Sequence, residues 1–384
     1  MKVLMALDMD RDRDSGTSGW AEFLAAALER RGVHVDLLYR EHLPSAVRRL
    51  NRNLSSITDT PLRMLRRIRE WQRTRGPYDV IECWDPAAYL FSRLRSRAER
   101  SRTRLVLNRS AGTLGRMWRI HAQTGDLYAR SWKFGLWHRY VQLPQERSAL
   151  RGSDLVLVSC SRDLDFVQRV VRPLHAQIAI TPPGVSDELF GGAARRDHDL
   201  LYVGTWIPRK GTRYLREAYA LIADRRPGTE LTIVGVGDDQ VARVRGGFDS
   251  PHVRVIGKLA TPALIEEYRR HRVLLFPSLC EGFGRVVLEA MAAGLGVVAT
   301  DEGGASDLIE DGVNGHLVAC RDAGALAARA LELLEDRGRC AQLGAAATLT
   351  ARGYTWDAAA ARTLALYRAL LLHQAAAAPG DRAP

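Results

Sequence analysis

Short apolar runs alternate with longer amphipathic stretches along most of the chain. Runs that are apolar at consecutive positions are typical of strands buried on both faces of a parallel sheet. Strands are predicted at 3–8, 34–39, 79–84, 104–108, 154–160, 178–181, 200–203, 231–234, 253–256, 273–276, 297–299 and 316–318. Helices are predicted at 19–31, 211–224, 238–245, 262–271, 285–294, 322–336 and 356–374. This alternation predicts an α/β fold in which helices cover both faces of parallel sheets.

The alternation is interrupted at Pro182-Pro183-Gly184, a combination that is typical of a domain boundary. We therefore expect two Rossmann-like domains, 1–184 and 185–355, that face each other across a cleft. The apolar helix predicted at 356–374 follows them. The Ala-, Pro- and Gly-rich tail at 375–384 is expected to be disordered.

The composition narrows the class of protein. The chain has 384 residues and 46% hydrophobic residues, enough to bury full cores. Its five cysteines are scattered and form no C-x-x-C pair, which favours a reducing compartment over a disulfide framework or a zinc site. The apolar start is too short for a signal peptide, and no apolar run reaches the ~18–20 residues that span a bilayer. We therefore expect a cytoplasmic location.

Positive charge is concentrated in the first half. The net charge is +12, and residues 1–180 hold 32 Lys and Arg against 19 Asp and Glu. Within 44–75, arginines surround an apolar stripe, as in helices that dock on anionic lipid. This predicts peripheral contact with the inner membrane surface, although an ordinary helix with its arginines in water has the same pattern. A phosphorylated acceptor would also suit this half, whereas nucleic acid is not expected.

Two features of the first half lie on the ligand side of its predicted sheet. Gly16 and Thr17 occupy the turn between the first strand and the first helix, where ligands of doubly wound folds gather. This turn either helps to close over a ligand or is purely structural. Arg109 follows the strand at 104–108 and is a candidate for contact with an acceptor or a phosphate. A surface salt bridge is the alternative.

The most specific stretch follows the strand at 273–276. Gly282 and Gly284 allow the backbone to turn and to approach a ligand closely. The helix predicted from Arg285 would present free N–H groups and a partial positive charge to an anion.

Two carboxylates flank that predicted anion site. Glu281 lies in the loop before the helix, and Glu289 lies about two turns further on. Carboxylates that cannot both touch a phosphate predict a ligand with phosphate in the middle and hydroxyl groups at both ends. A nucleotide-sugar has this shape, and the alternative is a structural joint with two solvated glutamates.

Other turns also follow predicted strands of the second half. The segment 204–211 carries Arg209 and Lys210, which can bind phosphate oxygens. The segment 235–238 lacks the third glycine of a dinucleotide fingerprint and is weak evidence for NAD. Backbone groups around Lys258 and Leu259 are placed where a base could bind. A further turn is Glu302-Gly303-Gly304.

Together these segments resemble glycosyltransferase family 4, the retaining nucleotide-sugar transferases of GT-B fold. The matching segments are Pro183-Gly184-Val185 with Phe190, Val203-Gly204 with Lys210-Gly211, Val234-Gly235-Val236-Gly237, Glu281-Gly282-Phe283-Gly284 with Glu289-Ala290-Met291-Ala292, and Gly303-Gly304 with Asp311-Gly312-Val313-Asn314-Gly315. The resemblance is dense over 180–360 and loose before it. The paired glutamates are its specific part.

The resemblance implies roles for these residues. Glu281 would bind hydroxyl groups of the donor sugar, and Glu289 would bind the ribose hydroxyls. Lys210 and backbone N–H groups near Phe283 would neutralise the diphosphate. The implied catalytic set is Glu281, Lys210 and Arg209. The implied donor-binding set is Gly204, Thr205, Gly235, Lys258, Leu259, Gly282, Phe283, Gly284, Arg285, Val286 and Glu289. Gly16, Thr17 and Arg109 would serve the acceptor or the closing loop.

The chain departs from the family pattern at three positions. Thr205 stands where the family has an Arg after the glycine, and Arg209 is expected to substitute for it. Ala111 stands where many members have a His, so no catalytic His is named. Gly296 replaces a common Pro, which concerns only a turn.

The resemblance thus predicts a retaining transfer from a nucleoside-diphosphate sugar to a hydroxyl group of a carbohydrate, a lipid-linked acceptor or a small molecule. UDP is the default nucleotide. The co-substrate is expected to suffice without a cofactor or a metal. Two alternatives stay open. One is a sugar-nucleotide epimerase on a related two-domain scaffold, and the other is a non-catalytic module that binds anions or lipid.

Overall fold

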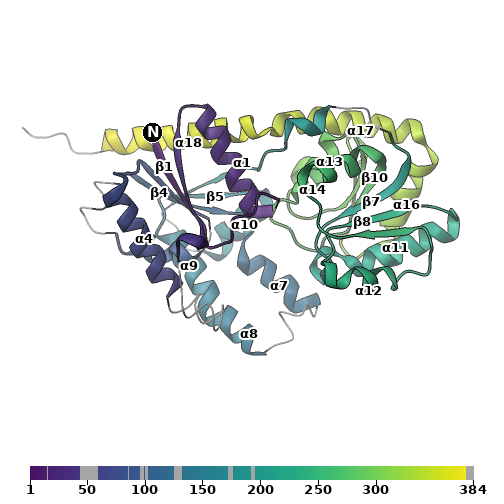
Figure 1. Ribbon diagram of the computed structural model, residues 1–384, viewed down its shortest axis with the longest axis horizontal. Helices are drawn as coiled ribbons and strands as arrows, with labels where there is room; N and C mark the ends of the chain where they lie inside the picture. Colours follow the sequence, from purple (N-terminus) through teal and green to yellow (C-terminus); the bar gives the residue numbers. More distant parts are fainter. Residues whose placement is uncertain are drawn as a thin grey trace, which may run out of the picture.

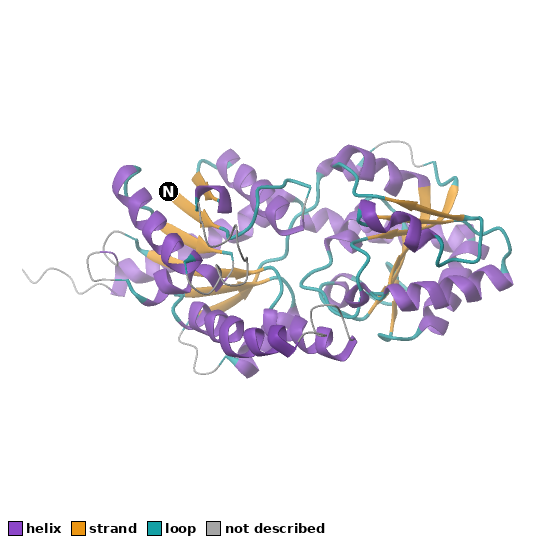
Figure 2. Ribbon diagram, turned by 60° about the horizontal axis from the view of Figure 1, so that its bottom comes forward, coloured by secondary structure: helices purple, strands orange, loops and turns teal. Residues whose placement is uncertain are grey.

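The computed structural model describes residues 1–14, 16–43, 59–84, 86–95, 99, 103–124, 132–171, 176–191 and 195–377. Two separate groups of parallel strands, each flanked by helices, are visible in Figure 2. The strands are β1 (Lys2–Ala6), β2 (His34–Leu38), β3 (Val80–Cys83), β4 (Leu105–Ser110), β5 (Leu155–Val158), β6 (Gln177–Ile180), β7 (His198–Val203), β8 (Leu231–Val234), β9 (Val253–Ile256), β10 (His271–Phe276), β11 (Gly296–Thr300) and β12 (His316–Val318). The α-helices are α1 (Gly16–Arg30), α4 (Thr60–Thr74), α5 (Tyr89–Arg93), α7 (Leu114–Thr124), α8 (Trp132–Trp137), α9 (Leu143–Arg151), α10 (Ser161–Val170), α11 (Thr212–Arg225), α12 (Val241–Arg245), α13 (Thr261–Arg270), α14 (Arg285–Ala292), α15 (Ala305–Leu308), α16 (Ala323–Glu335), α17 (Arg337–Ala351) and α18 (Trp356–Ala377).

The N-terminal sheet has the order β2-β1-β3-β4-β5-β6, and every pairing is parallel. Alternate residues of each strand enter cores on opposite faces. In β1, Val3 and Met5 pack with α1 and α18, whereas Leu4 and Ala6 pack with α4 and α5. Because both faces are covered, the strands are apolar at consecutive positions.

The C-terminal sheet has the order β12-β11-β10-β7-β8-β9 and is also parallel throughout. Helices α11 and α16 pack on one face, and α13 and α14 pack on the other. The strand order reverses between the neighbouring strands β7 and β10, because β8 and β9 follow on one side and β11 and β12 on the other. In such sheets ligands bind outside the carboxyl ends of the strands near the reversal.

The last helix, α18, returns to the N-terminal sheet. Figure 1 shows it in yellow beside α1, where its buried Trp356 and Tyr367 join the core of α1 and β1. Its carboxylate Asp357 receives two hydrogen bonds from Arg31, at 3.0 and 2.6 Å. The helix thus ties the end of the described chain to its beginning.

The chain passes between the two sheets at two neighbouring places. Residues 181–191 lead out of β6, and residues 352–355 lead into α18. The two segments touch, because Val185 N–H donates to the Tyr354 carbonyl at 2.8 Å. A Cβ on Gly184 would come within 2.5 Å of the Trp356 backbone, so only glycine fits this contact.

The expected fold class is confirmed: twelve strands lie where apolar runs predict them, with ends that differ by a few residues. The predicted helices did not include α7, α8, α9, α10, α15 or α17. The last helix extends past its predicted end at 374 to Ala377. Residues 378–384 and most of the basic segment before α4, 44–58, lie outside the described residues. Among the described residues, no helix combines the length and the apolar character needed to cross a bilayer.

Candidate functional site

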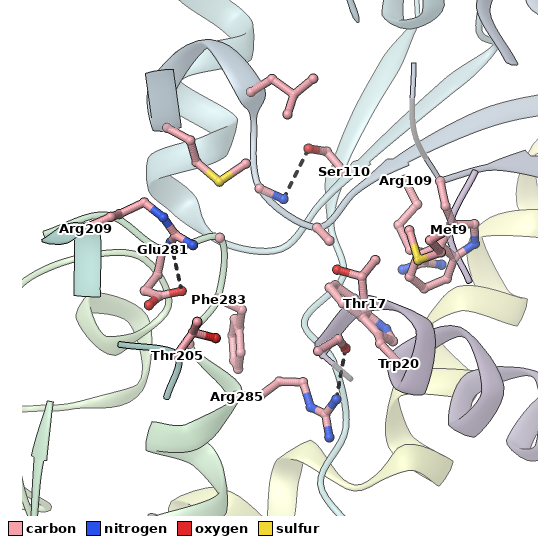
Figure 3. A pocket seen from close by; sticks show the side chains of 18 of the residues that line it. Met9, Thr17, Trp20, Arg109, Ser110, Thr205, Arg209, Glu281, Phe283 and Arg285 are labelled. Atoms are coloured by element: carbon pink, nitrogen blue, oxygen red, sulfur yellow. Dashed lines mark hydrogen bonds and ion pairs between the residues drawn. The ribbon is translucent and has the colours of Figure 1, made fainter. Parts of the chain in front are cut away.

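Two adjoining cavities lie where the carboxyl ends of the two sheets face each other. The first, here called the Trp84 cavity, has a volume of about 450 Å³ and is shown in Figure 3. Trp20, Trp84 and Met117 line it from the N-terminal side, and Lys210 and Glu281 from the C-terminal side. The second, here called the Tyr268 cavity, measures about 520 Å³. Its lining includes the predicted donor residues Gly204, Thr205, Gly235, Lys258, Leu259, Arg285, Val286 and Glu289.

Glu281 is a buried carboxylate of the Trp84 cavity that three neighbouring side chains hold in place. It is 6% exposed, and its Oε1 lies 2.5 Å from Lys210 Nζ and 2.7 Å from Ser278 Oγ. Arg209 Nη1 is 3.7 Å from its Oε2. Burial alone would raise the pKa of Glu281, but the positive charges of Lys210 and Arg209 hold this pKa below its usual value. The structure therefore presents an ionised carboxylate that can accept hydrogen bonds from hydroxyl groups.

Close backbone packing places Lys210 beside Glu281. The 3₁₀ turn Pro208–Lys210 ends at Gly211, which has a φ of +70°. A Cβ on Gly211 would lie 1.8 Å from the Pro277 carbonyl oxygen. Only glycine combines this left-handed conformation with so close an approach. The Leu279 N–H also donates to the Arg209 carbonyl at 2.8 Å, which aligns the two loops.

The loop after Glu281 touches the N-terminal domain and then starts α14. A Cβ on Gly282 would lie 1.8 Å from the Ala111 carbonyl oxygen, so glycine allows the two domains to meet here. Gly284, with φ of +80°, precedes the first helical residue, Arg285. The N–H groups of the first helical turn lack partners within the helix and carry partial positive charge. Phe283 and Gly284 line the Trp84 cavity, so this helix end faces the site.

Glu289 lines the Tyr268 cavity. Its Oε2 accepts a hydrogen bond from the Tyr268 hydroxyl at 2.9 Å, and its Oε1 accepts one from Arg285 Nη2 at 3.0 Å. Burial raises the pKa of Tyr268 well above its usual value, so the phenol stays protonated and donates. Glu281 and Glu289 thus belong to different but adjoining cavities.

The N-terminal loop before α1 closes over the Tyr268 cavity. Lys258 Nζ forms a 2.6 Å ion pair with Asp12, and Thr261 Oγ1 donates to Asp14 at 2.6 Å. Gly16 lines both cavities, and Thr17 lines the Trp84 cavity. Lys258 therefore contacts the opposite domain as well as the cavity.

Arg109 does not present a free guanidinium to the cleft. Arg109 belongs to β4 and is 1% exposed, although it forms part of the wall of the Trp84 cavity. Its Nε donates to Glu82 at 2.6 Å, its Nη1 to Thr181 at 2.7 Å and its Nη2 to Thr363 at 3.2 Å. Arg109 thus forms a buried ion pair between β4 and β3 and a hydrogen bond to α18. It does not form the exposed phosphate contact that the sequence suggested.

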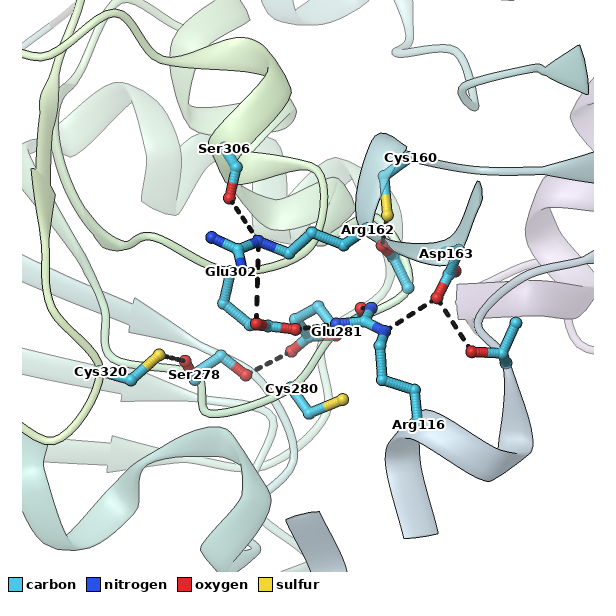
Figure 4. A network of polar contacts seen from close by, with 12 residues as sticks. Arg116, Cys160, Arg162, Asp163, Ser278, Cys280, Glu281, Glu302, Ser306 and Cys320 are labelled. Atoms are coloured by element: carbon cyan, nitrogen blue, oxygen red, sulfur yellow. Dashed lines mark hydrogen bonds and ion pairs between the residues drawn. The ribbon is translucent and has the colours of Figure 1, made fainter. Parts of the chain in front are cut away.

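A network across the cleft was not foreseen from the sequence (Figure 4). Arg116 of α7 donates to Asp163 at 2.9 Å, and it also contacts the Glu302 carboxylate and the Glu281 carbonyl oxygen. Burial lowers the pKa of Arg116, but Asp163 and the other negative groups raise it by more, so it stays charged. Asp163 is fully buried and Glu302 is 8% exposed. The sequence around Arg116 could not predict this role, because its partners Asp163 and Glu302 are far away in the chain.

A second carboxyl group of the Trp84 cavity was also missed. Glu146 of α9 is 8% exposed and accepts hydrogen bonds from the backbone N–H groups of Leu114 and Gly115, at 2.7 and 3.3 Å. Burial raises the pKa of Glu146 to about 7. It therefore holds the first turn of α7 beside the cavity and titrates near neutral pH.

Comparisons with known proteins agree with this arrangement. Residues 197–336 match the family model of glycosyl transferases group 1. The chain is 34% identical over 181 residues to a phosphatidyl-myo-inositol mannosyltransferase of Mycolicibacterium smegmatis, which covers 47% of this chain and 47% of that protein. It is 31% identical over 260 residues to a glycogen synthase of Mycobacterium tuberculosis, covering 65% of this chain and 62% of the relative. The match to the first relative thus spans about half of its length.

The fold is also that of a solved structure, the sucrose-phosphate synthase of Thermosynechococcus elongatus. The TM-score is 0.78 at 21% identity, with 97% of this chain and 99% of the other covered. The fold is thus that of the GT-B glycosyltransferases, and over about half to two thirds of its length the chain is similar in sequence to glycosyltransferases.

The departures from the family 4 pattern now have places in the structure. Thr205, where the family has an Arg, lies where the two cavities meet. Arg209, expected to substitute, donates from Nη1 to the Cys280 carbonyl at 2.7 Å and lines the Trp84 cavity. Ala111, where many family members have a His, contributes its carbonyl to the contact with Gly282. The substitution by Arg209 and the roles of the other residues stay predictions.

Proposed function

We propose that this chain transfers a sugar from a nucleoside-diphosphate sugar to an acceptor hydroxyl group, with retention of the anomeric configuration. One observation carries the proposal. Glu281 with Lys210 and Glu289 with Tyr268 line two adjoining cavities, and the first turn of α14 lies between these carboxylates. A nucleoside in the Tyr268 cavity and a sugar in the Trp84 cavity would place the diphosphate beside that helix end.

Charge development explains how this geometry would act. As the bond between the anomeric carbon and the phosphate oxygen breaks, negative charge grows on the leaving diphosphate. Lys210 and the N–H groups that begin α14 are fixed donors for this charge, and one such donor is worth roughly 3–4 kcal/mol in barrier height. The acceptor oxygen then bonds to the anomeric carbon, and its proton passes to the diphosphate oxygen on the same face. Because the acceptor oxygen bonds directly to the anomeric carbon, no protein nucleophile takes part, and the role of Glu281 is to bind sugar hydroxyls.

The two domains would divide the work. We assign acceptor binding to the N-terminal domain, 1–184, donor binding to the C-terminal domain, 185–355, and the tie between them to the helix that begins at 356. The indoles of Trp20 and Trp84 give the acceptor side a largely apolar wall. The name of the Mycolicibacterium smegmatis relative pairs mannosyl transfer with phosphatidyl-myo-inositol, which supports a lipid-linked acceptor among the candidates.

A lipid-linked acceptor would be consistent with contact at an anionic inner membrane surface from the cytoplasmic side. Helix α4 buries Met64, Ile68 and Trp71 in the core and turns Arg66 and Arg73 outward. Contact would therefore be electrostatic rather than by insertion of an apolar face. The fraction of the protein that floats with vesicles of anionic lipid should fall as the salt concentration is raised, because salt screens surface charges.

Metal-free catalysis is part of the proposal. Lys210 and the amino end of α14 supply positive charge where a metal ion would otherwise balance the diphosphate. Turnover should therefore be unchanged by EDTA. A loss of turnover that added Mg²⁺ restores would contradict this part alone.

A panel of nucleotides tests the function. UDP, GDP, ADP and TDP are added in turn, and the preferred diphosphate should raise the melting temperature by mass action. The matching sugar donors are then supplied with candidate acceptors, and NMR reads the anomeric configuration of the product. Epimerisation without an acceptor would favour the epimerase. Vesicle binding without donor hydrolysis or transfer would favour the non-catalytic module.

A further inference from the structure

The two cavities share part of their walls. Gly16, Thr205, Arg285 and Val286 line both the Trp84 cavity and the Tyr268 cavity. On the proposed function, on which this inference rests, the nucleoside and the sugar occupy different cavities. The diphosphate that links them must then pass these four residues.

Among the four shared residues, only Arg285 carries a charge. Thr205, where the family 4 pattern has an arginine, is neutral. Lys210 and Arg209 line the Trp84 cavity but not the Tyr268 cavity, and there Lys210 Nζ is 2.5 Å from Glu281 and Arg209 Nη1 donates to the Cys280 carbonyl. The place where the cavities meet would therefore lack a guanidinium if Arg285 did not supply it.

Groups from three parts of the fold position the Arg285 guanidinium. Its Nη2 donates to Glu289 at 3.0 Å, and its Nη1 donates to the Gly16 carbonyl of the N-terminal domain at 3.0 Å. It also lies over the Trp356 ring of α18, with 5.6 Å from Cζ to the ring centroid. The side chain is 21% exposed, so it is held in place while part of it faces the cavities.

We propose that Arg285 binds the donor diphosphate and takes the role that the missing arginine at Thr205 would have. The guanidinium fork matches phosphate oxygens, and Arg285 begins α14, so its charge adds to that of the helix end. The family arginine would reach the diphosphate from the loop after β7. In this chain the cation comes from the other wall of the same passage.

Contact with Gly16 gives this arrangement a further property. Because Gly16 belongs to α1 of the N-terminal domain, Arg285 is in its binding position when the two domains are close. Diphosphate binding and closure of the cleft therefore favour each other. An arginine at position 205 would bind the diphosphate without the hydrogen bond from Arg285 Nη1 to Gly16, so its binding would not be coupled to closure in this way.

The test compares a diphosphate with its own nucleoside. The diphosphate is the one among UDP, GDP, ADP and TDP that most raises the melting temperature of the wild type. Calorimetry measures its affinity, and NMR titration, which also covers weak binding, measures that of the nucleoside. Arg285→Gln should weaken the diphosphate roughly 10- to 100-fold, the range for a lost charge-assisted hydrogen bond, and change the nucleoside less than about twofold.

A matched control and a rescue sharpen the test. Arg213 on α11 also pairs with a glutamate one turn on, Glu217, at 2.7 Å, but it lies outside both cavities. Arg213→Gln should leave both affinities unchanged. Adding Thr205→Arg to Arg285→Gln should restore most of the lost diphosphate affinity, because it returns a guanidinium to the same passage.

The outcomes separate this inference from the proposed function. Equal weakening of nucleoside and diphosphate by Arg285→Gln would show a structural role, and no weakening would show no role. Either result overturns the inference while the proposed function stands. If none of the four diphosphates binds the wild type, both are overturned. Should Arg285→Gln lower the melting temperature of the free protein, Arg285→Lys decides: it keeps the cation and should retain most of the preference for the diphosphate.

Discussion

The carboxyl-end edges of the two sheets both carry cationic side chains, but these side chains differ in how far they are buried. On the N-terminal edge, Arg109 is 1% exposed. Its nitrogens donate hydrogen bonds to Glu82, Thr181 and Thr363. On the C-terminal edge, the side chains of Lys210 and Arg285 are 19% and 21% exposed and line cavities. Protein partners thus enclose Arg109, whereas the partners of Lys210 and Arg285 leave part of each side chain exposed beside a cavity.

The largest expected effect concerns the buried pair on the N-terminal edge. Arg109→Met leaves Glu82 as a buried carboxylate without its cation, and such a loss costs about 3–5 kcal/mol of unfolding free energy. Urea denaturation measures it. Arg213→Met, on the surface of α11, should change stability by less than about 0.5 kcal/mol. If Arg109→Met were as stable as this control, the N-terminal arginine would not be structural.

The next effect concerns the C-terminal edge. Glu281→Gln keeps the shape of the side chain but removes the charge that Lys210 and Arg209 face. We expect kcat/KM to fall about 100- to 1000-fold, because a neutral amide accepts weaker hydrogen bonds from the sugar and leaves Lys210 without its partner. Steady-state kinetics with the preferred donor checks this. Glu217→Gln, which breaks an exposed pair, is the control, and equal turnover by both variants would contradict the role of Glu281.

Opposite pKa shifts on the two edges predict opposite dependences on pH. Burial raises the pKa of Glu146 to about 7, above the value of an unfolded glutamate, so the folded state binds more protons between these values. The resulting loss of stability is complete above pH 7 and disappears as the pH falls toward 5. Glu281, with its lowered pKa, stabilises the fold above the usual glutamate pKa, and this is lost in acid.

Unfolding of the wild type and of Glu146→Gln at pH 5 and pH 8 tests the first of these shifts. The variant should gain stability relative to the wild type at pH 8, by roughly 3 kcal/mol at most. A difference that does not change between the two pH values would show that Glu146 does not titrate in this range. Glu188→Gln, an exposed glutamate in the turn Asp187–Phe190, is the matched control.

A smaller effect is expected where the edges touch. Gly282→Ala would bring a Cβ to 1.8 Å from the Ala111 carbonyl and force the domains apart there. Since misplacement by about 1 Å can cost up to 100-fold in rate, we expect kcat/KM to fall about 10- to 100-fold with little change in melting temperature. Gly191→Ala, where a Cβ meets nothing within 4 Å, is the control. Full activity of Gly282→Ala would show that the reaction does not need this contact.

The sequence predicted most of the fold because the strands are buried on both faces. In β10, every residue is buried, and the apolar run Val273 to Phe276 is visible without any tertiary information. Among the helices that were not predicted, α17 has an Ala- and Thr-rich sequence with a weak apolar period. The C-terminal motifs were found for a related reason: they are contiguous turns after strands.

The contacts that could not be predicted join residues far apart in the chain. Thr363 on α18 helps to enclose Arg109, and Glu302 lies opposite Arg116 across the cleft. No local pattern records such pairings, since they depend on how the two domains meet. The same holds for Glu146, whose raised pKa comes from burial that only the assembled fold creates.

The neighbouring connections at 181–191 and 352–355 have a mechanical consequence. Because the Val185 N–H is bonded to the Tyr354 carbonyl, the two connections form one hinge rather than two independent tethers. We expect relative motion of the domains to be mainly a swing about this point, with the largest displacement at the far rim of the cleft. A few backbone torsions near Gly184 would set how wide the entrance opens.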